Sequence, residues 1–205
     1  MDTKEDIKLF GKWSFDVEVL DQGLQSYINL EPVFVPHSGG KHAGQRFWKA
    51  EKVNLVERLL NKIMRSSVGA KKFGGKYLRG GGATGKKALA TRIVKKSFEI
   101  IEQRTKRNPV QVLVDAIQNA APREETTTII YGGVNYHQAV DIAPMRRIDM
   151  ALKHLVVAAY GNAFNKKNTI EDCLADEIVG AANNDTRSFA IKKKEEMERI
   201  AQASR

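Results

Sequence analysis

The amino-acid sequence predicts a mainly α-helical protein: a bundle of about six helices with one protruding β-hairpin and an extended N-terminal arm. Apolar residues recur at helical spacing over most of the chain after residue 50, which is typical of amphipathic helices. Residues 124–142 instead hold a β-branched and aromatic run followed by an alternating run, with the pair Gly132 and Gly133 between them, which is typical of a hairpin. The first 50 residues follow neither period. We therefore assign residues 1–50 to the arm and residues 51–205 to a helical domain.

Positive charge is concentrated in one part of the sequence. The formal net charge is +10, and residues 32–110 hold 19 basic and 4 acidic residues. Residues 1–31 hold 3 basic and 7 acidic residues, and residues 111–205 hold 12 and 13. A localised basic field predicts a polyanionic partner, with nucleic acid as the first candidate and an anionic membrane surface as the second.

Composition also bounds the compartment. No run approaches the ~20 apolar residues that a membrane span needs, and the acidic N-terminus is unlike a secretory signal. The single cysteine, Cys173, fits a reducing intracellular compartment, so we expect a cytoplasmic protein. Because Cys173 shares a helical stripe with Ile170, Leu174 and Ile178, we interpret it as a buried apolar residue.

The predicted arm has little helical character. Residues 16–20 have the composition of a short strand, and Pro32 and Pro36 favour extended backbone after it. Aromatic side chains are scattered along the arm, where they either pin it to the helical body or stack on bases. We favour pinning. These residues are Trp13, Phe15, Phe34, Phe47 and Trp48.

Two helices and a glycine-rich loop follow the arm. The first helix is expected over residues 52–65, with a polar face that carries Lys52, Arg58, Lys62 and Arg65. The loop, residues 69–85, has no core-forming pattern and carries Lys71, Lys72, Lys76 and Arg79. The second helix is expected over residues 86–104, with Lys87, Arg92, Lys95 and Lys96 largely off its apolar face.

The remaining helices have recognisable start signals. Asn108 and Pro109 suit the N-cap and first position of a third helix. A fourth helix follows the hairpin and is expected to end near residues 161–162. Thr169 and Asp172 resemble a capping box for a fifth. A sixth is expected over residues 186–203, with an apolar stripe of Ala190, Met197, Ile200 and Ala201.

The predicted hairpin allows two interpretations. Residues 126–131 are β-branched and aromatic, and apolar residues alternate with polar ones over residues 134–142. Two strands alone are only marginally stable in water. The hairpin is therefore either a structural element packed on helices or an arm that reaches a partner, and we favour the arm.

Residues 80–87 resemble a phosphate-binding P-loop except at the last position. Lys87 stands where that motif has a magnesium-binding hydroxyl, and a second ammonium group there would repel the metal. Nucleotide hydrolysis is therefore not expected. The same residues suit a basic loop that enters a helix N-terminus, where free backbone N–H groups favour phosphate.

No catalytic or metal-binding pattern stands out in the sequence. The histidines show no metal-ligand spacing with one another or with Cys173, and His154 is interpreted as a structural residue within a helix. No Ser-His-Asp arrangement or pair of carboxylates is evident. We therefore expect no enzymatic activity, no cofactor and no metal.

Basic clusters are the strongest local signals. Lys86 with Lys87, Lys95 with Lys96, Arg146 with Arg147, and Lys192, Lys193 and Lys194 lie at helix starts or on polar faces, which suits phosphate contacts. Two arginines at the start of a helix oppose its dipole, and a polyanion would compensate them. Lys192 and Lys194 equally suit intrahelical pairs with Glu196 and Glu198.

Three motifs are characteristic. They read Pro-Val-Gln-Val-Leu-Val-Asp-Ala-Ile-Gln-Asn at residues 109–119, Gln-Ala-Val-Asp-Ile-Ala-Pro-Met-Arg-Arg at residues 138–147 after the Gly132-Gly133 turn, and Phe-Ala-Ile-Lys-Lys-Lys-Glu-Glu-Met-Glu-Arg at residues 189–199. With residues 9–14 and 46–50, they resemble the S-seven family of small-subunit ribosomal proteins, the universal head protein, in its archaeal–eukaryotic form.

The resemblance implies a helical bundle with an extended hairpin that binds the 3′ major domain of small-subunit rRNA and nucleates assembly of the head. It places the hairpin near exit-site tRNA and the mRNA path, beside other head and platform proteins. Outside the ribosome we expect a monomer. The implied rRNA-facing residues are Lys52, Lys62, Lys86, Lys87, Arg92, Lys95, Lys96, Arg146, Arg147, Lys192, Lys193 and Lys194, and the loop adds Lys71, Lys72, Lys76 and Arg79. The implied hairpin tip is Tyr131, Gly132, Gly133, Val134, Asn135 and Tyr136.

The tip departs from the family pattern. Related hairpins often carry arginines there, whereas this chain has Thr128, Ile129, Ile130, Tyr131, Tyr136 and His137. Stacking or packing by the two tyrosines is the expected replacement for phosphate contact. An alternative function is a DNA-bending architectural protein that uses the hairpin as a minor-groove arm, although the Gly-Gly-Val-Asn tip lacks an apolar wedge such as proline.

Overall fold

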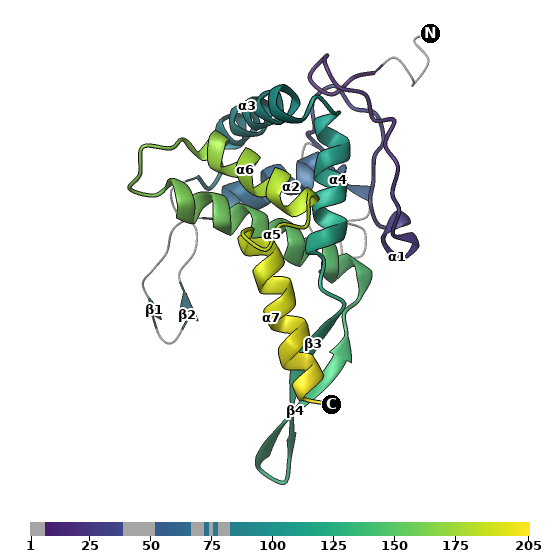
Figure 1. Ribbon diagram of the computed structural model, residues 1–205, viewed down its shortest axis with the longest axis vertical. Helices are drawn as coiled ribbons and strands as arrows, with labels where there is room; N and C mark the ends of the chain where they lie inside the picture. The colour runs from purple at the N-terminus through teal and green to yellow at the C-terminus, as the bar shows by residue number, and fades with distance from the viewer. Residues whose placement is uncertain (1–6, 39–51, 67–71, 74–75, 78–82) are drawn as a thin grey trace.

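A long β-hairpin projects from a bundle of helices, as Figure 1 shows. The computed structural model describes residues 7–38, 52–66, 72–73, 76–77 and 83–205. The predicted fold class is confirmed. The elements in these residues are α1 (Gln22–Gln25), α2 (Leu55–Arg65), β1 (Lys72–Phe73), β2 (Lys76–Tyr77), α3 (Lys87–Thr105), α4 (Pro109–Ala120), β3 (Glu124–Tyr131), β4 (Val134–Asp141), α5 (Pro144–Ala163), α6 (Ile170–Ala182) and α7 (Phe189–Ala203).

Capping residues explain where the helices begin. Asn108 Oδ1 accepts a hydrogen bond from the backbone N–H of Val110 at 3.0 Å, with Pro109 in the first turn of α4. Thr169 caps α6, and its hydroxyl also donates to the Asp172 carboxylate at 2.7 Å. Helix α7 begins three residues later than expected because Ser188 is its N-cap.

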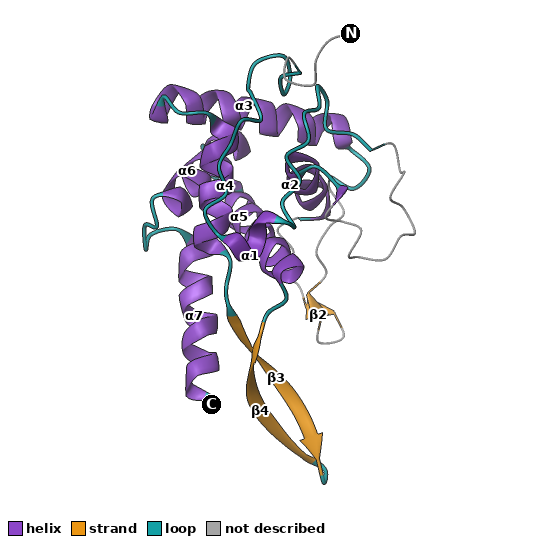
Figure 2. Cartoon of the chain, turned by 90° about the vertical axis from the view of Figure 1, so that its right-hand side faces the viewer, coloured by secondary structure: helices purple, strands orange, loops and turns teal. Residues whose placement is uncertain are grey.

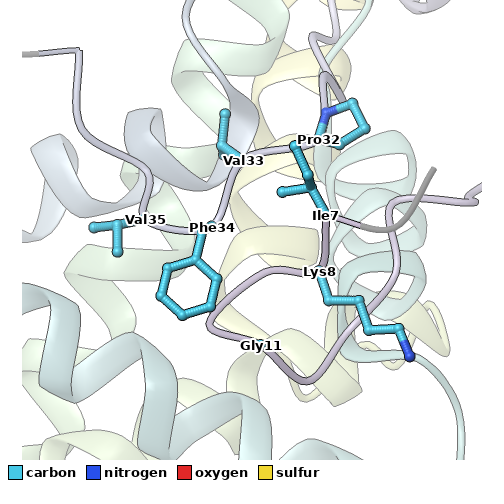
Figure 3. Close-up of a pocket in the computed structure, with 7 residues that line it drawn as sticks. All are labelled: Ile7, Lys8, Gly11, Pro32, Val33, Phe34 and Val35. Carbon is cyan, nitrogen blue, oxygen red and sulfur yellow. The ribbon is translucent and has the colours of Figure 1, made fainter. Parts of the chain in front are cut away.

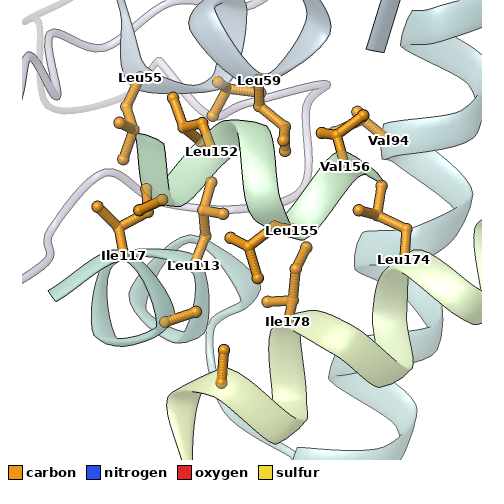
Figure 4. Close-up of a cluster of buried hydrophobic side chains, with 14 of the residues drawn as sticks. Leu55, Leu59, Val94, Leu113, Ile117, Leu152, Leu155, Val156, Leu174 and Ile178 are labelled. Atoms are coloured by element: carbon orange, nitrogen blue, oxygen red, sulfur yellow. The ribbon is translucent and has the colours of Figure 1, made fainter. Parts of the chain in front are cut away.

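The hydrophobic core lies around α5 and α6. Helices α3, α4 and α5 pack against α6, and α2 and α7 pack against α5. Figure 4 shows leucine and isoleucine side chains from several helices meeting there. Leu59, Leu113, Leu155 and Ile178 have no exposed surface. Burial of each such side chain contributes about 1.5–3 kcal/mol, so this cluster is a main source of stability.

The hairpin is anchored at its base and free at its tip. Strands β3 and β4 are antiparallel, with Glu124 opposite Asp141 and Tyr131 opposite Val134. Both strands contact α7 near the base, where Glu198 accepts a hydrogen bond from the backbone N–H of Arg123 at 2.9 Å. Residues 127–138 are all exposed, and Figure 2 shows the twisted ribbon extending away from the helices. Packing on helices therefore accounts for the base of the hairpin only.

Residues 7–38 wrap along the helical body. Leu9, Trp13 and Leu24 are buried in the common core, and Trp13 Nε1 donates to Glu102 at 3.0 Å. Trp13 packs edge-on against Phe98, which agrees with the pinning interpretation. The division of the chain at residue 50 stays a prediction, because residues 39–51, with Phe47 and Trp48, lie outside the described residues.

Three local predictions were wrong. Residues 16–20 form no strand, because their extended backbone pairs with a side chain: Glu18 N–H donates to Gln111 Oε1 at 2.9 Å. Arg58 is buried at 5% exposure rather than lying on the polar face of α2. Ile200, expected on an apolar stripe, is 47% exposed. Helix α1 and the short strands β1 and β2 were not predicted.

Candidate nucleic-acid interface

Exposed cations cover the outer face of α3. Lys86, Arg92 and Lys95 are exposed, and none of them forms an ion pair with the part of the chain that the structure describes. Lys96 is also exposed and lies 3.8 Å from Glu171 of α6, a long and weak contact. The buried residues of α3 are Ala90, Ile93, Val94, Ser97, Phe98 and Ile101. Because this apolar face of α3 is packed into the core, the four cations on the other side face solvent.

The start of α3 is not capped by a side chain. Lys86 occupies the N-cap position and makes no capping hydrogen bond, and Gly85 before it has a φ of +77°. Lys87, which replaces the hydroxyl residue of a P-loop, donates a hydrogen bond to the buried Glu57 carboxylate at 2.7 Å. This pair leaves an open helix N-terminus beside Lys86, where backbone N–H groups and one ammonium group can meet a phosphate.

Two predicted cations serve internal ion pairs. Lys87 and Ser38 both donate hydrogen bonds to the Glu57 carboxylate. Burial raises the pKa of Glu57, but these hydrogen bonds outweigh the effect of burial and hold the pKa below its ordinary value. Lys62 lies 3.1 Å from Asp149, which also pairs with Arg58 at 3.3 Å. Lys62 and Lys87 each retain 23% exposure. They have less free surface for phosphate than the α3 cations.

The two arginines at the start of α5 have different roles. Arg147 is 11% exposed, pairs with Asp21 at 3.0 Å and donates to the Pro122 carbonyl oxygen at 3.1 Å. Its charge is thus compensated inside the protein, so the helix dipole alone gives no reason for a polyanion beside Arg147, and its rRNA contact stays a prediction. Arg146 is 60% exposed and forms a two-pronged pair with Glu125 at 2.8 Å. Arg147 therefore has less free charge for an outside phosphate than Arg146.

The lysines of α7 are also unequal. Lys192 is exposed and has no ion pair among the described residues. Lys193 pairs with Glu196 at 2.5 Å, and Lys194 donates to the carbonyl oxygen of Asn119 at 2.8 Å. An ion pair within α7 is therefore present, but it joins Lys193 to Glu196, whereas the expected pairs were Lys192 with Glu196 and Lys194 with Glu198. Among these three lysines, Lys192 alone has neither an ion pair nor a side-chain hydrogen bond to a described residue.

The remaining predicted cations lie before α2 and in the glycine-rich loop. Lys71 and Arg79 lie outside the described residues. Lys72 and Lys76 lie on β1 and β2, which pair in antiparallel register, with Phe73 opposite Lys76. Lys52 is exposed just before α2, and its carbonyl oxygen accepts a hydrogen bond from Asn29 at 3.0 Å.

The hairpin tip carries apolar and aromatic surface. Tyr131 is 79% exposed, Ile130 71%, Val134 54% and Tyr136 53%. Gly132 and Gly133 form the turn with φ values of +59° and +80°, a conformation that suits glycine. No lysine or arginine occurs in β3 or β4. A contact made by this tip therefore depends on stacking or packing, whereas the α3 surface depends on charge.

An apolar pocket of about 530 Å³ lies in the N-terminal segment (Figure 3). It is lined by Ile7, Lys8, Gly11, Pro32, Val33, Phe34 and Val35, of which Lys8 alone is ionisable. Lys8 has no second ionisable group beside it among the described lining residues, so the lining lacks the paired acid, base or nucleophile that hydrolysis or group transfer requires. The pocket is consequently not a candidate catalytic site.

The described residues contain no metal-binding cluster, exposed thiol or membrane-spanning helix. Within the described ranges, no cluster of histidine, cysteine and acidic side chains suits a metal ion. Cys173 is buried at 3% exposure, as predicted, and burial raises the pKa of its thiol. No helix in the part of the chain that the structure describes is both long and apolar enough to cross a membrane.

Sequence reasoning overlooked one lysine doublet. Lys166 and Lys167 are exposed in the loop between α5 and α6 and form no ion pair within the described residues. Their signal was present in the sequence as an Asn-Lys-Lys-Asn run at residues 165–168. The internal partners of Arg58 and Arg147 had no such signal, because they lie far away in the chain.

The fold and this surface define a basic helical protein with a projecting β-hairpin and cations that lack internal partners. A family model described as Ribosomal protein S7p/S5e matches residues 24–205. The chain belongs to this family of small-subunit ribosomal proteins. The match covers every helix from α2 onwards and the whole hairpin.

Proposed function

We propose that this protein is a structural, non-catalytic constituent of the small ribosomal subunit that binds the 3′ major domain of the rRNA and helps to nucleate the head. The observation that carries the proposal is the outer face of α3, where Lys86, Arg92 and Lys95 are exposed without ion-pair partners in the described residues. Family membership supplies the RNA class. The proposed location is the cytoplasmic ribosome, with no cofactor.

Physical chemistry supports phosphate as the ligand of this surface. A cation without a carboxylate partner is free to replace the counterions of a nucleic-acid backbone, and their release drives binding. Lys96, Arg146 and Lys192 are exposed and would add contacts beside this face, whereas Lys62 and Lys87 would contribute mainly by orienting α2 and α3. The other proposed contacts are Lys52, Lys71, Lys72, Lys76, Arg79, Arg147, Lys193 and Lys194.

The hairpin is proposed to reach toward exit-site tRNA and the mRNA path. Its anchored base and exposed distal half give it the reach, and its tip would contact bases or neighbouring head and platform proteins through Tyr131 and Tyr136. Outside the ribosome the protein is proposed to be a monomer. No observation favours the DNA-bending alternative over this function.

The test is a salt series of binding to the isolated 3′ major domain RNA, with duplex DNA as competitor. The double variant Arg92→Gln plus Lys95→Gln should weaken binding and reduce the slope of log K against log salt by about 1.4–1.8, the value for two phosphate contacts. The matched control is Lys8→Gln plus Lys106→Gln, which removes the same charge elsewhere and should bind more like the native protein. Equal weakening by both doubles, or equal competition by DNA, would indicate unspecific attraction and contradict the proposal.

A further inference from the structure

We propose that the loop between α5 and α6 is a second RNA contact, in which an unpaired base stacks on Phe164 while Lys166 and Lys167 hold the adjoining phosphates. This inference rests on the proposed RNA-binding function and adds a site to it. Phe164 is 62% exposed, although a phenylalanine is usually buried. Its neighbours from Asn165 to Thr169 are also exposed. The loop thus combines an open aromatic ring with two free cations.

The backbone holds this ring in a defined position. Phe164 is the C-cap of α5, and its N–H donates to the Tyr160 carbonyl oxygen at 3.0 Å. Asn165 then takes a φ of +56°, a left-handed conformation that asparagine tolerates better than most residues. Lys166 N–H turns back to the Ala163 carbonyl oxygen at 3.3 Å. The ring and the lysines therefore project from one tight turn rather than from a flexible linker.

The loop also lies at the end of the α3 surface. Ser97 donates to the Glu171 carbonyl oxygen at 3.0 Å, and Arg104, two turns further along α3, pairs with Asp176 of α6. Helices α3 and α6 therefore run side by side in the same direction. Ser97 lies beside Glu171, near the start of α6, and the α5–α6 loop comes just before that start. Arg92 lies five residues before Ser97, which is about 7.5 Å back along the axis of α3. Arg92 is therefore level with the α5–α6 loop. Figure 1 shows α3 beside α6 and the loop at the end of both α5 and α6.

Aromatic and cationic groups together favour unpaired nucleotides. Bases stack on exposed aromatic rings in single-stranded segments, and lysines beside the ring neutralise the backbone. A paired helix hides its base faces and could use only the lysines. A protein partner would use the ring as apolar surface and would gain little from two neighbouring ammonium groups. The combination in this loop fits an unpaired segment of RNA next to the phosphates that the α3 cations are proposed to contact.

The experiment compares four substitutions in the full chain, using the 3′ major domain RNA as the probe. Phe164→Ala should weaken binding about five- to 150-fold, the effect of losing one stacked base, with an unchanged salt slope. Phe164→Trp should bind within about two-fold of the native protein because it keeps a stacking face. Phe164→Leu should bind as weakly as Phe164→Ala. Phe34→Ala is the matched control, since Phe34 is 60% exposed at a different place, and should bind like the native protein.

The lysines have their own readout. Lys166→Gln plus Lys167→Gln should weaken binding and also lower the salt slope, which distinguishes their role from that of the ring. If Phe164→Ala binds like the native protein while Arg92→Gln plus Lys95→Gln binds weakly, the stacking site is wrong and the proposed function stands. If Phe164→Leu retains native affinity, the ring is only apolar surface and the inference is overturned. Loss of effect in every variant, including the α3 double, would overturn both proposals.

Discussion

Arg147 and Asp21 stand 126 positions apart in the sequence, and their side chains form an ion pair with Arg147 Nη2 3.0 Å from Asp21 Oδ2. The same guanidinium donates to the Pro122 carbonyl oxygen. One side chain thus joins the N-terminal segment, the end of α4 and the start of α5. The backbone N–H of Asp21 is held in turn by Gln118 of α4 at 2.7 Å. The hairpin lies in the chain between Pro122 and the start of α5, so this junction fixes the base of the hairpin.

The first prediction concerns this junction. Arg147→Gln should lower the free energy of unfolding by about 1–3 kcal/mol, because it removes a largely buried charged hydrogen-bond donor from two partners. Arg146→Gln is the neighbouring control and should cost less than about 1 kcal/mol, since its pair with Glu125 is exposed. Urea unfolding of both variants measures the difference. Equal losses would show that the two arginines are equivalent, contrary to the structure.

Local signals explain how much of the fold could be predicted. Helix periodicity, Asn108 with Pro109, and the capping pair of Thr169 and Asp172 depend on neighbouring residues, so the helices from α2 to α7 were predicted to within one to three residues. The glycine pair of the hairpin turn is equally local. Such signals depend on a few positions and do not need the tertiary structure.

Long-range partners explain the misses. Arg58 and Arg147 look like surface cations in the sequence, and only tertiary contact with Asp149 and Asp21 shows that they are interior. Residues 16–20 form no strand for the same reason. The backbone of Glu18 forms its hydrogen bonds with the Gln111 side chain, which is far away in the sequence, and not with another strand. For the candidate interface, the sequence identified which residues are cations, but only the structure shows which of them are already paired.

The second prediction follows from the buried carboxylate of Glu57. Hydrogen bonds from Lys87 and Ser38 outweigh its burial and keep its pKa below the ordinary value of 4.5. A lowered folded-state pKa contributes stability above the unfolded pKa, and this contribution is lost as pH falls through the folded value. Native stability should therefore drop more steeply below about pH 4.5 than the stability of Glu57→Gln.

The measurement is urea unfolding between pH 7 and pH 3. At pH 7, Glu57→Gln should be less stable by about 1–3 kcal/mol, because Lys87 loses a charged partner. The gap between the two proteins should narrow toward pH 3. Parallel curves across the whole range would mean that Glu57 does not titrate differently in the folded state.

The third prediction concerns the core between α4, α5 and α6. Leu155→Ala should cost about 2–5 kcal/mol, since it leaves a cavity among fully buried side chains such as Leu113 and Ile178. Leu20→Ala is the matched control. Leu20 is 78% exposed, so the same substitution should change stability by no more than about 0.5 kcal/mol. Thermal unfolding of both variants checks the contrast, and a large effect at Leu20 would show that the N-terminal segment buries it.

The last prediction separates the hairpin turn from the helices. Gly132 has a φ of +59° with no atom near an added Cβ, so Gly132→Ala is resisted by backbone strain and not by crowding. Left-handed backbone costs a non-glycine residue about 1–2 kcal/mol, which should loosen the tip because residues 127–138 have little else to hold them. Amide hydrogen exchange in β3 and β4 should accelerate while α5 and α6 keep their protection.

Gly161→Ala is the control within a helix. It also has open space around the added Cβ but no positive φ, and it should raise stability by about 0.5–1 kcal/mol. Unchanged exchange in the Gly132→Ala hairpin would mean that contacts at the base, through Arg123 and Glu198, suffice to order the whole ribbon.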